Sequence, residues 1–176
     1  IFAVVFAFNL ARPGALERHS FERLALRLIG FGMVASVPYM ALNGSWPLNI
    51  LFTFLMALAV CLLLERGHYR FAVFCFLVGG LLVEYLWFGI ALVVAAWWYF
   101  KQPAALPLAL LLLMWAGLGI VNGSHSALLA IPLVWMLSLV RVNLPRSRWA
   151  FYVYYPAHLA LIVFVAAWWP SLGGQS

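Results

Sequence analysis

The sequence is poor in charged residues and in cysteine. Only 8% of its 176 residues are charged, four of these are acidic, and it has two cysteines. So few charges cannot supply the polar surface that a soluble domain of this length needs. Cys61 and Cys75 both lie inside apolar runs, so we expect buried free thiols and no disulfide framework or zinc site.

Several common ligand motifs are also missing. The sequence lacks GxGxxG, GxxxxGK[ST] and HExxH, which leaves pyridine-nucleotide, P-loop ATPase and zincin interpretations without support. No metal is expected. The formal net charge of +6 comes from basic residues spread over several loops with no continuous stripe, so nucleic acid is not an expected partner.

Apolar residues, by contrast, are abundant. They make up 68% of the chain, its mean hydropathy is +1.07, and nine Trp and seven Tyr are available to anchor helices at bilayer interfaces. The sequence therefore predicts an all-α fold, a polytopic transmembrane helix bundle whose main partner is the lipid bilayer. Apolar runs between helix breakers predict about eight segments, at 1–11, 24–42, 46–64, 71–83, 85–100, 105–121, 126–140 and 150–169.

Two features of this segmentation carry further expectations. Gly79-Gly80 and the polar Glu84 favour a break between the fourth and fifth segments. The first run is shorter than the about 20 residues of a transmembrane helix, so we expect a partial helix, with one or more N-terminal helices missing. No repeat or linker divides the rest, and residues 1–176 are expected to be a single integral-membrane domain.

The charges alternate between the predicted connections. In an eight-segment bundle all ten basic residues fall on one side, and the connections on the other side carry only Glu84 or no charge. The positive-inside rule makes the basic side cytoplasmic and places the C-terminus in the periplasm. The basic residues are Arg12, Arg18, Arg23, Arg27, Arg66, Arg70, Lys101, Arg141, Arg146 and Arg148.

Two ionisable residues stand out within or between the apolar runs. An imidazole such as His158 is costly inside a membrane span and is suited to proton transfer near neutral pH; the alternative interpretation is a histidine bonded to a neighbouring helix. Counted from the start of the last predicted segment, at the rise of an α-helix, His158 falls near the bilayer centre. Glu84 is the only acidic residue away from the cytoplasmic loops. It is interpreted either as a solvated turn carboxylate or as a general base or His orienter.

Other polar residues allow two interpretations each. Arg23 and Arg27 lie one helical turn apart, either as snorkelling interfacial charges or as ligands for the phosphates of a nucleotide-like donor. Asn49 and Thr53 also lie one turn apart, and they either bond neighbouring helices or face a substrate.

Five sequence elements stand in order along nearly the whole chain. They are the Phe-Ala-rich run ending at Arg12, Arg27-Leu-Ile-Gly-Phe with Ser36-Val-Pro38-Tyr39, Asn49-Ile-Leu-Phe-Thr53, Glu84-Tyr85 with Gly89, and Phe151-Tyr-Val-Tyr-Tyr-Pro-Ala-His158-Leu. Taken together and in this order, they resemble the TraX family of bacterial membrane proteins, best known for conjugative pilin N-acetylation. Two departures are visible: Leu86 replaces a Gly and Glu84 an Asp of the family pattern, and the Asp-His pair of the family's first helix has no counterpart.

The resemblance implies an acetyltransferase of the bacterial inner membrane, with acetyl-CoA as co-substrate. The acceptor would be an amine or hydroxyl, on a pilin subunit or an envelope glycan. His158 and Glu84 would be catalytic, with His158 the general base or the orienter of that base. The phosphates of CoA would bind at Arg12, Arg18, Arg23 and Arg27. Tyr152 and Tyr155 would line the thioester channel or donate to the carbonyl oxygen. Asn49 and Thr53 would lie on the acceptor side, which Glu84 would also shape.

Two alternatives stay open from the sequence. Buried polar residues, a proline within a helix and a broken fourth-fifth pair also suit a transporter or flippase, although no internal repeat supports one. A non-catalytic subunit of a pilus or secretion assembly fits the same composition. Binding of acetyl-CoA separates the enzyme from both.

Overall fold

The computed structural model describes residues 2–121, 136 and 150–173. Within these residues the regular secondary structure is helical, apart from one isolated bridge. The all-α prediction is confirmed for this part of the chain. Its helices are α1 (Phe2–Leu10), α2 (Arg18–Asn43), α3 (Ile50–Glu65), α4 (Tyr69–Leu82), α5 (Leu86–Lys101), α6 (Ala105–Val121) and α8 (Ala150–Gly173).

The helix bounds follow the predicted apolar segments closely. The fourth and fifth segments are separate helices, with the break at residues 83–85 as expected. The largest difference is at α2, which begins at Arg18 because the charged stretch before its apolar run is also helical. The predicted segment 126–140 lies outside the described residues.

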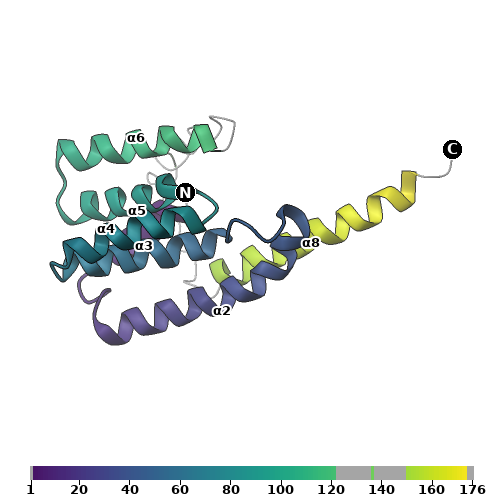
Figure 1. Ribbon diagram of the computed structural model, residues 1–176, viewed down its shortest axis with the longest axis horizontal. Coiled ribbons are helices and arrows are strands. Elements are labelled where there is room, and N and C mark those ends of the chain that lie inside the picture. Colours follow the sequence, from purple (N-terminus) through teal and green to yellow (C-terminus); the bar gives the residue numbers. More distant parts are fainter. Residues whose placement is uncertain (1, 122–135, 137–149, 174–176) are drawn as a thin grey trace.

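Helix α5 is the centre of the bundle. It packs against α1, α3, α4 and α6, while α2 packs against α3 and α8 (Figure 1). Seven α5 residues are buried, among them Ile90, Val93 and Ala96 with no exposed surface. A helix that is apolar on every side has no preferred face, so packing alone decides which side meets which neighbour.

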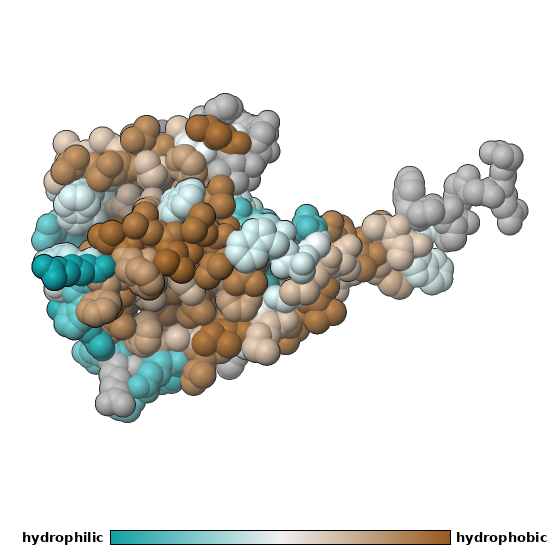
Figure 2. All heavy atoms as spheres, viewed as in Figure 1, coloured by the Kyte–Doolittle hydropathy of each residue, from teal (hydrophilic) through white to brown (hydrophobic). Residues whose placement is uncertain are grey.

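The outer surface is strongly apolar. Figure 2 shows hydrophobic side chains over most of the visible face, and residues such as Met33, Val37 and Ile120 are more than 60% exposed. Apolar side chains spread over most of a face are unusual on soluble monomers and mark contact with a membrane or a partner. In the described residues one helix, at His19–Asn43, is long and apolar enough to cross a membrane, and five shorter apolar helices accompany it. This is weak evidence for a membrane protein, and several spans remain a prediction from the sequence.

The two ends of the bundle differ in polarity. Figure 1 places the α1–α2 connection, the α3–α4 turn and the α5–α6 connection at one end, where Figure 2 shows hydrophilic side chains. We call this the basic end, since Arg12, Arg66 and Lys101 lie in or beside these connections. The connections 44–49 and 83–85 lie at the other end, called here the distal end. The structure thus groups the described connections by charge as predicted; which side of a membrane each faces is still a prediction.

Helix α8 starts partway along the bundle. It lies along α2 near its own N-terminal half and then runs on beyond the distal end (Figure 1). Tyr152 and Leu159 are buried on this contact, whereas Phe164 and Trp168 are more than half exposed.

Candidate functional site

Asn49 joins helices α2 and α3 at the distal end. Its side-chain oxygen accepts a hydrogen bond from the backbone N–H of Leu51 at 3.0 Å, so Asn49 is the N-cap of α3. Its amide nitrogen donates to the carbonyl of Gly32 at 2.9 Å and to the hydroxyl of Ser36 at 3.0 Å. Asn49 has no exposed surface, and these bonds satisfy its amide. Of the two interpretations of this residue, the structure shows the bond to a neighbouring helix.

The connection between α4 and α5, residues 83–85, is held beside this cap by two backbone hydrogen bonds. Leu48 donates its N–H to the carbonyl of Leu82 at 2.9 Å and accepts from the N–H of Glu84 at 2.8 Å. These two backbone bonds hold residues 82–84 against the start of α3. Leu86, immediately after, has a φ of 50°, which is left-handed and unfavourable for a side-chain-bearing residue. It is the position at which the family pattern has glycine, so the departure seen in the sequence has a conformational cost.

The Glu84 carboxylate is consequently held inside the protein. It interacts with the backbone N–H of Ile50. Its Oε2 atom is buried and has no hydrogen-bond partner among the described residues. Burial raises the pKa of Glu84 from 4.5 to about 7, with the Ile50 N–H acting in the opposite direction. Glu84 is half-buried and its Oε2 is covered, which favours the interpretation as a general base or His orienter over a solvated turn carboxylate. A carboxyl with a pKa near neutrality can both accept and return a proton.

Three tyrosines lie near enough to this carboxylate for its charge to act on them. Its charge acts on the hydroxyls of Tyr39, Tyr85 and Tyr155, which come from α2, the 83–85 connection and α8. Burial, followed by the charge of Glu84, raises the pKa of Tyr85 to about 12, so its hydroxyl stays protonated as a donor. Tyr155 also interacts with the backbone N–H of Ile50. We call Glu84, the three tyrosines and this N–H the Glu84 cluster.

Thr53 lies one turn along α3 from Asn49 and is 1% exposed. Its hydroxyl has no hydrogen-bond partner among the described residues, and its methyl group lies against Gly89 of α5. A Cβ on Gly89 would come within 2.8 Å of that methyl and 2.6 Å of Tyr85 Cβ, so the glycine allows this close helix contact. Thr53 is a buried packing residue with one unsatisfied group next to the Glu84 cluster.

Two further predicted residues lie between the cluster and the basic end. Tyr152 precedes Tyr155 by about one turn of α8, and its ring packs on Phe31 with centroids 5.5 Å apart. The charge of Arg27 acts on Tyr152, and Arg27 is half-buried. Arg27, Tyr152, Tyr155 and Glu84 therefore follow one another along the α2–α8 contact.

The other arginines are not brought together with Arg27. Arg12 is exposed and lies over the ring of Phe8 at 5.1 Å, and Arg23 is exposed and donates from Nε to the carbonyl of His19 at 3.1 Å. Arg18 begins α2, and its side chain lies outside the description. All three lie toward the basic end, on or next to the first turns of α2.

His158 differs from its expected setting. It is exposed within the described structure, and its ring stacks on Tyr154 one turn earlier, with centroids 5.5 Å apart and planes 5° apart. It follows Tyr155, which lies level with the start of α3, so His158 lies at the distal end of the described helices. Its depth in a membrane stays a prediction.

The sequence missed Tyr39 and Tyr85 as site residues. Both belong to elements that carry the family resemblance, and that is the one signal that pointed to them. No group of three or more His, Cys, Asp or Glu side chains in the described part of the chain could hold a metal ion.

A family model described as TraX protein matches residues 1–166. No curated protein and no solved structure matches the chain.

Proposed function

The chain belongs to the TraX family, and from this membership we propose that it is a membrane-embedded acetyltransferase. Family membership favours a role related to conjugation or pili. In the proposed reaction an acetyl group passes from acetyl-CoA to an amine or hydroxyl, on a pilin subunit or an envelope glycan. The proposed setting is the bacterial inner membrane, with the basic end in the cytoplasm and the acceptor at the distal end.

The observation that supports this proposal most is the buried Glu84 carboxylate with a pKa of about 7. An acceptor amine must lose a proton as it attacks the thioester carbonyl, and a carboxylate of this pKa is suited to take it. A new bond forms between the acceptor nitrogen and the carbonyl carbon, and the carbon–sulfur bond breaks. The proton held by Glu84 then passes to the leaving thiolate, which gives free CoA and the acetylated acceptor.

The same cluster offers donors for the developing oxyanion. The Tyr85 hydroxyl stays protonated, and the Tyr155 hydroxyl and the Ile50 N–H lie beside the carboxylate. The N–H belongs to the first turn of α3, where the helix dipole favours negative charge. Preorganised donors of this kind stabilise the tetrahedral intermediate of acyl transfer by about 3–4 kcal/mol each.

Arg27 and Tyr152 would serve the acetyl-CoA side. Arg27 and Ser36 are about 14 Å apart along α2 at helical rise, and Ser36 bonds Asn49 at the distal end. An extended pantetheine arm reaching from the basic end would pass along this stretch. Arg27 would attract the anionic donor, and Arg12, Arg18 and Arg23 stay predictions for its phosphates at the inner mouth.

The test uses the full-length protein in detergent with acetyl-labelled acetyl-CoA. Transfer is measured to a processed-pilin N-terminal peptide and to an envelope glycan fraction. Glu84→Gln keeps the shape and removes the base, so transfer should fall by about 10²–10⁴-fold while acetyl-CoA still raises the melting temperature. Glu17→Gln, at an exposed glutamate before α2, is the matched control and should retain full transfer.

Other outcomes separate the alternatives. Unchanged transfer in Glu84→Gln would remove Glu84 as the base and return that role to His158, whose His158→Ala variant is measured in parallel. If acetyl-CoA neither stabilises the protein nor transfers its label, the transporter or non-catalytic subunit becomes the better interpretation.

A further inference from the structure

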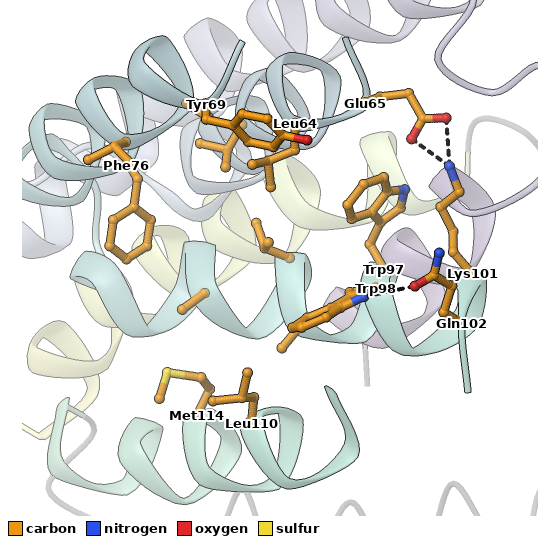
Figure 3. A pocket seen from close by; sticks show the side chains of 16 residues that line it. Leu64, Glu65, Tyr69, Phe76, Trp97, Trp98, Lys101, Gln102, Leu110 and Met114 are labelled. Atoms are coloured by element: carbon orange, nitrogen blue, oxygen red, sulfur yellow. Dashed lines mark hydrogen bonds and ion pairs between the residues drawn. The ribbon is translucent and has the colours of Figure 1, made fainter. Parts of the chain in front are cut away.

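A second cavity lies at the basic end, away from the Glu84 cluster. It has a volume of about 730 Å³ and opens between α4 and α6, with α5 as its floor (Figure 3). Tyr69 and Phe76 approach from α4, and Leu110 and Met114 from α6. None of its lining residues belongs to the Glu84 cluster.

The polar groups of this cavity gather at one end. Lys101 donates to Glu65 Oε1 at 2.6 Å and also contacts Oε2, and Trp98 Nε1 donates to the Gln102 side chain at 3.5 Å. Figure 3 shows these pairs on the same side, with the Trp97 ring beside the Glu65–Lys101 pair. The rest of the wall is apolar: Val60, Leu64, Ala72, Val73, Phe76, Ala91, Val94, Ala95, Leu110 and Met114.

One donor at the polar end has no acceptor. Trp97 is 7% exposed, and its indole Nε1 is buried without a hydrogen-bond partner among the described residues. Leaving a buried donor unpaired is unfavourable, so a ligand that brings an acceptor oxygen would relieve that cost. The Lys101 ammonium lies 5.1 Å from the centre of the same ring, which keeps the indole in place.

The apolar part of the cavity has the length of one bilayer leaflet. The lining residues of α5 run from Ala91 to Lys101, which is about 15 Å at helical rise. Half of a bilayer's hydrocarbon core is also about 15 Å thick. The flanking helices also present apolar side chains outward, including Leu77 of α4 and Leu113 of α6, each more than half exposed.

We propose that this cavity binds one acyl chain of an anionic glycerophospholipid. The chain lies along α5 between α4 and α6, and an ester or phosphate oxygen accepts the hydrogen bond of Trp97 Nε1. The charge at the mouth favours an anionic headgroup: Lys101 and Glu65 balance each other, and Arg66 and Arg70 follow in the adjoining turn. This inference rests on the membrane setting of the proposed function and not on acetyl transfer.

The experiment is native mass spectrometry of the delipidated full-length protein titrated with phosphatidylglycerol, with phosphatidylcholine of the same chains as the comparison. We expect phosphatidylglycerol to bind several-fold more tightly. Trp97→Phe keeps the ring and removes the donor, so its affinity for phosphatidylglycerol should fall about fivefold. The melting temperature of the lipid-free variant is measured as well, because Trp97→Phe also shrinks a buried ring that Lys101 contacts; the expected result is a folded variant with weakened binding.

A second pair of variants tests the position of the chain. Ala91→Phe fills the apolar part and should abolish lipid binding, whereas Ala109→Phe, exposed on α6 and outside the cavity, should bind as wild type. The proposal is overturned by equal binding of the two lipids or by wild-type affinity in Trp97→Phe. Glu84→Gln should bind phosphatidylglycerol normally while losing acetyl transfer, so the two proposals fail separately.

Discussion

Replacing Asn49 by alanine should destabilise the protein by about 2–3 kcal/mol. The change removes the N-cap of α3, which is worth about 1 kcal/mol. It also removes two bonds to α2, from the amide nitrogen to Gly32 and to Ser36, each worth about 0.6 kcal/mol between packed apolar helices. The carbonyl of Gly32 still accepts from the Ser36 hydroxyl at 2.8 Å, so the main group left unpaired is the N–H of Leu51.

The assay is unfolding of the full-length protein in mild detergent, followed by circular dichroism as denaturant is added. Asn49→Ser should recover about 1 kcal/mol, because serine can cap the helix but cannot reach α2. Asn43→Ala, at the exposed C-terminal residue of α2, is the control and should change the free energy of unfolding by less than about 0.5 kcal/mol.

Equal stability of Asn49→Ala and Asn43→Ala would refute this account of Asn49 as the joint between α2 and α3. A stable Asn49→Ala variant that fails to acetylate would instead return Asn49 to the acceptor side. Loss of both stability and transfer, restored together by Asn49→Ser, supports the structural role.

Four further outcomes follow from the same contacts. Burial raises the pKa of Glu84 to about 7 and disfavours its ionised form in the folded state, so wild-type stability should fall relative to Glu84→Gln as pH rises from 4.5 through 7. The loss should reach about 2 kcal/mol in pH-dependent denaturation, once solvent at this partly exposed group is allowed for. Leu86→Gly should stabilise the protein by up to about 1 kcal/mol in the same assay, because its left-handed φ then carries no side chain. Gly89→Ala should cost about 1–3 kcal/mol in thermal unfolding, whereas Gly30→Ala, with no atom near its new Cβ, should gain about 0.5–1 kcal/mol. His158→Ala should change the melting temperature little and reduce transfer less than Glu84→Gln, since the exposed imidazole contacts Tyr154 and lies outside the Glu84 cluster.

Local sequence was enough to predict the helices and the break before α5. Apolar runs bounded by Gly, Pro and charged residues predicted α6 at 105–121, and Gly79-Gly80 with Glu84 predicted the separation of α4 from α5. These features depend on backbone hydrogen bonding within each segment. They need no knowledge of which helices are neighbours.

The candidate site could be predicted only in part. Glu84 and Tyr155 were named from the sequence, but their meeting depends on α8 lying against α2 and on Leu48 holding the 83–85 connection. Periodicity could not supply this arrangement, because helices that are apolar all round offer no face to read. The position of His158 relative to the other helices is decided in the same way, since the offset of α8 along α2 is a property of packing.

The sequence by itself determined that this chain is helical, apolar on its surface and basic in alternate connections. Composition and charge spacing are local quantities, and they are complete before any helix meets another. Only the tertiary structure decided that Oε2 of Glu84 is buried, that Asn49 is a cap joined to α2, and that His158 is exposed. Each of those outcomes depends on atoms from helices distant in the chain, which desolvate one carboxylate, satisfy one amide and leave one imidazole uncovered.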